Sequence, residues 1–150
     1  MNSKMKKKVM KDEGDTTFYQ FDSQMGFWGV KNIERDVIFF GKTEQPVKVI
    51  HNSEGNRENE IVLKDDENTI VCLGGSHTWG AAVEQNSRYT GCLEKITNMK
   101  VVNMGHCSLG LDQVCIAILS KSAKYSPKII IVEQYPWAVH RVLNNYVNGY

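Results

Sequence analysis

Three short apolar runs alternate with two helical patterns in the second half of this 150-residue chain. The runs cover residues 69–73, 101–103 and 129–132, and they are apolar along most of their length. Strands of this kind are typical of a parallel sheet that is covered on both faces. The pattern therefore predicts an α/β fold, in which each strand–helix–strand unit is right-handed.

The segments between these strands carry apolar residues at helical spacing. In residues 89–99 the apolar positions are 89, 92, 93 and 96, and in residues 111–119 they are 111, 114, 115, 118 and 119. The second set forms a complete amphipathic face. We therefore expect one helix before the second strand and another that ends ahead of Pro127.

Composition divides the chain into three parts. Residues 1–17 join a lysine-rich block to acidic residues, which predicts a disordered, solvated tail. Residues 18–68 form an N-terminal extension, in which residues 37–40 and 47–51 are interpreted as a hairpin or two short strands. Residues 69–150 hold the α/β part.

Charge and targeting signals exclude several functional classes. The net charge of +1 gives no field that favours nucleic acid or an anionic membrane, so neither is expected as a partner. No signal peptide or transmembrane segment is evident, so the default expectation is a cytoplasmic protein. The cysteines and histidines show no metal-ligand spacing, and we expect neither a metal nor a cofactor.

The first apolar strand is followed by G-G-S-H-T-W-G, residues 74–80. Ligands of open parallel sheets bind at the carboxyl ends of the strands, where this geometry places Ser76. Gly74 and Gly75 allow a sharp turn and close approach of a ligand. A serine hydroxyl there can act as a nucleophile if a base takes its proton and N–H groups hold the oxyanion. The alternative is a serine that caps a turn or a helix start.

Three known signatures do not fit this stretch. A P-loop requires a lysine, a dinucleotide fingerprint requires G-x-G-x-x-G, and the α/β-hydrolase elbow requires glycine where Thr78 stands. The remaining pattern, G-x-S-x-T-x-G, resembles the first motif of the SGNH (GDSL-type) hydrolases, with Gly75 in place of the usual aspartate.

Further segments resemble the same superfamily in the same order. Residues 47–57, which contain N-S-E-G-N-R, resemble a segment that precedes the serine strand, and residues 101–113 resemble the second motif. Residues 128–139 stand where the third strand and third motif belong. The resemblance covers about residues 18–145. It implies the amino-terminal portion of a three-layer, flavodoxin-like parallel sheet that is incomplete at its C-terminus.

The resemblance also implies roles for individual residues. Ser76 matches the nucleophile, and the main-chain N–H groups of Ser76 and Ser108 match two oxyanion donors, with Ser108 standing at the glycine of the second motif. The family's asparagine donor aligns roughly with Trp137. The family's D-x-x-H base is missing, because no aspartate has a histidine three residues later. Residues expected to line the site are Gly75, His77, Asn103, Gly105 and His106.

Two functions remain open. The first is a serine esterase or acyl hydrolase of SGNH type, with Ser76 as nucleophile and a small-molecule, glycan or lipid O-acyl ester as substrate. His106, in the loop after the second strand, could then form a substitute dyad with Ser76. The second is a truncated or non-catalytic half-domain that binds a partner or self-associates through the edge of strand 129–132. Arg57 could bind an anionic group, but stapling a turn is the favoured interpretation.

Overall fold

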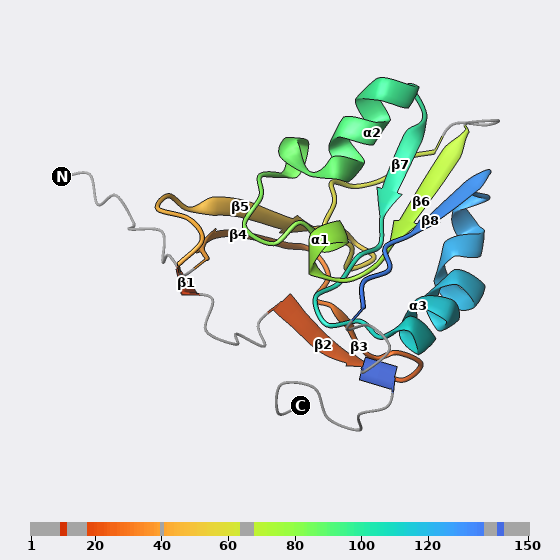
Figure 1. The fold of residues 1–150 in the computed structure, drawn as a ribbon, viewed down its shortest axis with the longest axis horizontal. Helices are drawn as coiled ribbons and strands as arrows, with labels where there is room; N and C mark the ends of the chain where they lie inside the picture. The colour runs from red at the N-terminus through yellow and green to blue at the C-terminus, as the bar shows by residue number, and fades with distance from the viewer. Residues whose placement is uncertain (1–9, 12–17, 40, 64–67, 137–140, 143–150) are drawn as a thin grey trace.

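The centre of the molecule is a three-stranded parallel sheet with the strand order β7–β6–β8 (Figure 1). Strand β6 (Thr69–Leu73) lies in the middle, between β7 (Lys100–Asn103) and β8 (Ile129–Val132). Every residue of β6 is buried, as expected for a strand covered on both faces. The computed structural model describes residues 10–11, 18–39, 41–63, 68–136 and 141–142.

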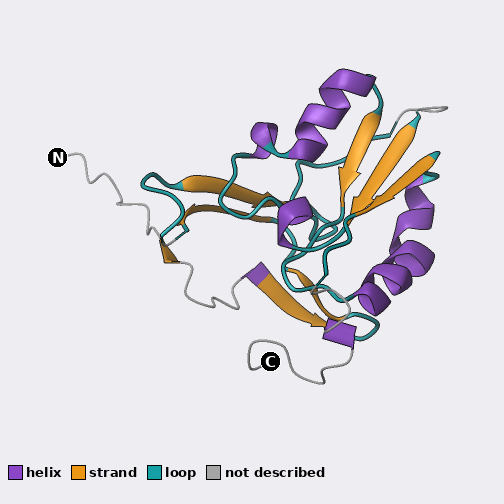
Figure 2. Cartoon of the chain, viewed as in Figure 1, coloured by secondary structure: helices purple, strands orange, loops and turns teal. Residues whose placement is uncertain are grey.

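Helices cover both faces of this sheet (Figure 1 and Figure 2). On one face Leu93 of α2 (Tyr89–Thr97) packs against Ile70 and Cys72. On the other, residues of α3 (Leu111–Ala117) pack against Val71 and its neighbours. The chain then continues as a π-helical turn over 118–122 and a 3-10 turn over 123–125. The predicted α/β class, with a parallel sheet flanked by helices, is confirmed.

The N-terminal extension contributes two further small sheets. Strand β4 (Ile33–Ile38) pairs antiparallel with β5 (Val47–His51), which confirms two strands in this region. Strand β1 (Met10–Lys11) pairs parallel with β4, and the rest of residues 1–17, where a disordered tail was expected, lies outside the described residues. Strands β2 (Tyr19–Asp22) and β3 (Gly26–Gly29) form a hairpin that the sequence did not predict.

The extension shares its hydrophobic cores with the α/β part. Trp28 of β3 is buried in one cluster with Leu73 of β6 and Met104. Val49 of β5 is buried in a second cluster with Trp79, which follows the serine turn. The segments before residue 69 therefore help to position the carboxyl edge of the parallel sheet.

Arg57 holds together the turn that follows the serine, which is the role that the sequence analysis favoured over anion binding. Its side chain is fully buried and its guanidinium lies 4.5 Å from the centre of the Trp79 ring. The guanidinium donates hydrogen bonds to three main-chain carbonyls of this turn, those of Trp79 (3.2 Å), Gly80 and Val83 (2.8 Å). It also donates to the main-chain carbonyl of Lys48 in β5 (3.3 Å). The Arg57 guanidinium is therefore not accessible to a substrate anion.

Because two histidines are buried, we expect the free energy of unfolding to fall in mild acid. Burial lowers the pKa of His51 to about 4, and burial also lowers the pKa of His106 well below its usual value. Both are neutral in the folded chain, whereas the unfolded chain protonates them near pH 6.5. Because the unfolded state binds more protons, the free energy of unfolding should fall as pH drops from about 6.5 toward 4. His51 alone should account for about 2 kcal/mol between pH 7 and pH 5.

Urea denaturation at the two pH values measures this change. The variant His51→Gln should show a smaller difference between them than the wild type does. Equal pH dependence in wild type and His51→Gln would contradict the assignment.

Candidate active site at the end of β6

Ser76 lies where the central strand ends and a short helix begins. Strand β6 leads through Gly74 and Gly75 into α1 (Ser76–Trp79), so the serine stands at the carboxyl edge of the parallel sheet and is partly exposed. A Cβ on Gly74 would lie 2.4 Å from the Cβ of Glu133, which explains the glycine at this position. This is the location that the sequence predicted for the hydroxyl group.

Glu133 anchors the serine turn to the third strand, and the sequence analysis missed it. It directly follows β8, and its Oε2 accepts hydrogen bonds from Thr78 N (2.8 Å) and Thr78 Oγ1 (2.6 Å). Its Oε1 lies 2.9 Å from His77 Nδ1. Burial raises the pKa of Glu133, but the hydrogen bonds from Thr78 and His77 outweigh burial and lower it. The carboxylate is therefore ionised and holds the turn against β8.

Asn103 joins the second-motif loop to the same turn. Its side chain is fully buried at the end of β7. Its Nδ2 donates to the Thr78 carbonyl (2.5 Å) and to Thr90 Oγ1 (3.1 Å), and its Oδ1 accepts from Gly105 N (2.9 Å). The first and second motifs are therefore in direct contact.

Gly105 and Ser108 have the backbone that this loop requires. A Cβ on Gly105 would lie 2.5 Å from Trp79 N, so only glycine allows the loop to pack this closely on α1. Ser108 has φ of 69°, in the left-handed region that glycine occupies most easily. The position at which the resemblance expects glycine thus keeps a glycine-like conformation with a serine side chain.

His106 does not form the substitute dyad. Its main-chain N–H donates to the Gly74 carbonyl (3.0 Å), but its imidazole is fully buried, with its ring centre 4.0 Å from that of Trp28. Neither ring nitrogen has a hydrogen-bond partner among the described residues, Ser76 included. Trp28, which belongs to the N-terminal extension, covers the imidazole, so the sequence of the loop alone could not predict this burial.

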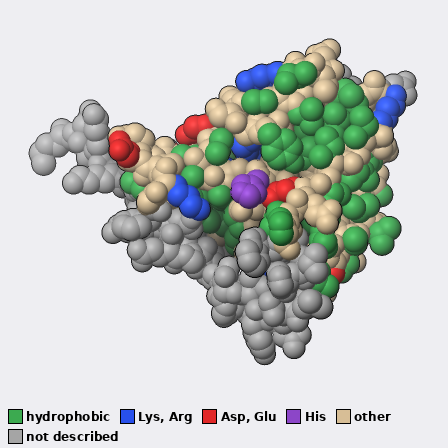
Figure 3. All heavy atoms as spheres, viewed as in Figure 1, with side chains coloured by type: hydrophobic (Ala, Val, Ile, Leu, Met, Phe, Trp, Pro, Cys, Tyr) green, Lys and Arg blue, Asp and Glu red, His purple; other side chains and the backbone are tan. Residues whose placement is uncertain are grey.

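The other histidines do not supply a base within the described chain either. His51 is bound to the Val30 carbonyl (3.0 Å) and to Trp79 Nε1 (3.3 Å). His77 is exposed and interacts with Glu133. Figure 3 shows an exposed histidine beside an acidic side chain near the centre of one face. His140 and Trp137 lie outside the described residues.

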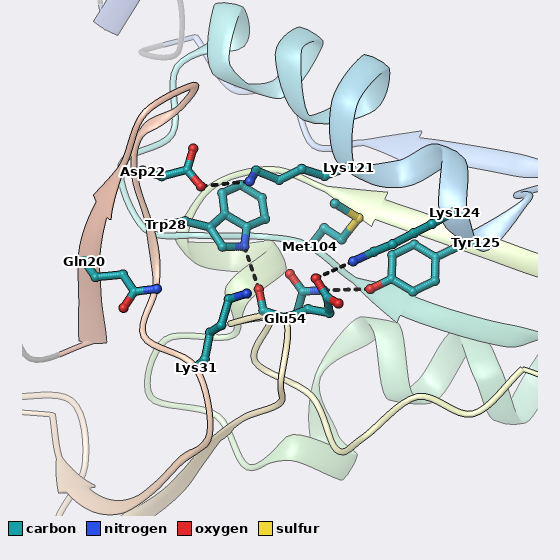
Figure 4. Close-up of a pocket in the computed structure, with 10 residues that line it drawn as sticks. Gln20, Asp22, Trp28, Lys31, Glu54, Met104, Lys121, Lys124 and Tyr125 are labelled. Carbon is teal, nitrogen blue, oxygen red and sulfur yellow. Dashed lines mark hydrogen bonds and ion pairs between the residues drawn. The ribbon is translucent and has the colours of Figure 1, made fainter.

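A polar hollow lies elsewhere on the molecule, and none of the expected site residues lines it (Figure 4). It is bordered by the β2–β3 hairpin, the 54–56 loop and the segment after α3. Lys121 pairs with Asp22 (2.8 Å), and Lys124 pairs with Glu54. Two of its lysines are thus neutralised within the chain.

Comparisons with known proteins do not show a family for this chain. No protein-family model matches the sequence, and no curated protein matches it significantly. Among the described residues, no group of three or more His, Cys, Asp or Glu side chains could hold a metal ion. In the same part of the chain, no helix has the length and apolar character needed to cross a membrane.

Replacing Glu133 tests how firmly the turn is held. In Glu133→Gln one of the two acceptor oxygens becomes a donor that faces other donors, so the free energy of unfolding should fall by about 1–3 kcal/mol. The control is Glu34→Gln, because Glu34 pairs with Lys48 at the surface and both side chains are about half exposed. That control should change stability by less than about 0.5 kcal/mol. Equal losses in urea denaturation would show that Glu133 is not an anchor.

Proposed function

We propose that this chain is the amino-terminal portion of an SGNH-type serine esterase or acyl hydrolase, with a flavodoxin-like arrangement of its parallel sheet. The observation that carries the proposal is the direct contact between the two resembling motifs. Asn103 of the second motif binds the Thr78 carbonyl, and His106 N–H binds the Gly74 carbonyl on the other side of Ser76. The two resembling motifs are thus joined by hydrogen bonds on both sides of Ser76.

The proposed reaction is acyl transfer through Ser76. The Oγ attacks the carbonyl carbon of an O-acyl ester, its proton passes to a general base, and the carbonyl oxygen becomes an oxyanion. The main-chain N–H groups of Ser76 and Ser108 donate to that oxyanion. When the C–O bond breaks, the alcohol leaves with the proton from the base. Water then attacks the acyl-serine, which releases the carboxylic acid and restores the hydroxyl group.

The general base in this proposal is an imidazole that the described residues do not supply. The three described histidines are engaged or buried elsewhere, so the imidazole must come from another segment or another polypeptide. Serine, imidazole and water balance the reaction by themselves, and no cofactor enters it. The substrate is an ester of a small molecule, a glycan or a lipid.

A fluorophosphonate probe tests this function. Its phosphorus bonds to an activated serine Oγ as fluoride and the hydroxyl proton leave. We expect labelling at Ser76 that added free imidazole accelerates, because imidazole replaces the missing base. The variant Ser76→Ala should abolish labelling, whereas Ser87→Ala, at an exposed serine of a 3-10 turn, should leave it unchanged. A folded wild-type chain that shows no Ser76-dependent labelling with or without imidazole would reject the function.

The exposed strand β8 favours a second candidate, a non-catalytic half-domain that self-associates. Ile129, Ile130 and Val132 are 47%, 40% and 40% exposed, and β8 pairs with β6 but with no other described strand. Exposed apolar edges recruit further strands. In this proposal the β8 edges of two copies pair with each other.

Sedimentation velocity over a range of concentrations tests this association. The wild type should show a monomer–dimer equilibrium, and Ile130→Lys should shift it to monomer. The control Ile96→Lys places the same charge at a residue of α2 that is 82% exposed, and should dimerise like the wild type. A wild type that remains monomeric at every concentration would refute the proposal.

A further inference from the structure

The side chain of Tyr135 lies beside the serine turn. A Cβ on Gly75, the residue before Ser76, would lie 3.1 Å from Tyr135 Cε1 and 3.3 Å from its hydroxyl oxygen. That oxygen is buried and has no hydrogen-bond partner among the described residues. A buried hydroxyl without a partner costs free energy, so its presence at a site calls for an explanation.

Neighbouring side chains hold the Tyr135 ring in place. The Arg141 guanidinium lies 5.0 Å from the ring centre, and the His77 ring stands edge-on to it at 6.4 Å. The Tyr135 ring is therefore held beside the first-motif turn.

The Tyr135 hydroxyl is a donor at neutral pH. Burial raises its pKa above the ordinary value, the nearby Arg141 partly opposes this, and the charge of Glu133 adds to it. The phenol consequently keeps its proton, and it has no acceptor within the described chain.

We propose that the Tyr135 hydroxyl donates a hydrogen bond to the substrate oxygen that becomes the oxyanion when Ser76 attacks. The inference rests on the proposed function and adds a side-chain donor to the main-chain N–H groups. A hydrogen-bond donor that already lies beside the reacting group stabilises the developing negative charge, because no side chain has to move during the reaction. This role accounts for a buried hydroxyl group that has no hydrogen-bond partner among the described residues.

An alkylboronic acid tests the role directly, because it does not need the missing base. Boron bonds to Ser76 Oγ, the hydroxyl proton goes to solvent, and the tetrahedral adduct carries its negative charge at the position of the oxyanion. Boron-11 NMR titration measures the affinity. We expect a saturable adduct in the wild type, none in Ser76→Ala, and binding weaker by roughly ten- to a hundredfold in Tyr135→Phe.

Two controls separate this role from a structural one. Tyr125→Phe alters a tyrosine whose hydroxyl already accepts a bond from Asn56, far along the chain from Ser76, and should bind boronic acid like the wild type. Thermal unfolding of Tyr135→Phe should match or exceed that of the wild type, because the lost hydroxyl has no partner in the described chain.

The possible failures are distinguishable. Equal boronic acid affinity in wild type and Tyr135→Phe overturns the inference and leaves the proposed function standing. The absence of any Ser76-dependent adduct in the wild type overturns both.

Discussion

The side chain of Asn103 connects the loops on which the rest of the site depends. Strands β6 and β7 run parallel, so the loops that leave them emerge side by side. Asn103 bridges these loops with bonds to the Thr78 carbonyl and the Gly105 N–H. A leucine of similar size would leave both groups unpaired in the interior, at about 1–3 kcal/mol each. The amide therefore fixes both the edge of the sheet and the position of Ser76.

A charged side chain that follows the third strand, β8, binds the same turn. Glu133 reaches the same Thr78 from β8, so groups from all three strands meet at one threonine rather than at the serine. Ser76 itself remains partly exposed. Thr78, whose backbone and side chain are hydrogen-bonded to Asn103 and Glu133, thus holds the turn in place, while the Ser76 hydroxyl stays available to a ligand. A positioned nucleophile requires such support from its neighbours.

The apolar runs predicted the parallel sheet because a strand buried on both faces has few polar residues to obscure it. The expected bounds of β6 and β8 agree with the structure, and Ser76 follows from them. Glu133 could not be predicted as an anchor, since a carboxylate after a strand gives no sign of which amide it will meet. The burial of His106 could not be predicted, because it depends on Trp28 in a hairpin without a strong sequence signal.

Amide hydrogen exchange in Asn103→Ala, measured residue by residue, tests most directly whether this side chain holds the two loops together. The account predicts that the N–H groups of Gly105, His106 and Trp79 lose protection together, by a larger factor than the N–H of Val71 in the central strand. Wild-type protection at Trp79 and His106 would contradict it, because the turn that carries the serine would then keep its place without the bridge.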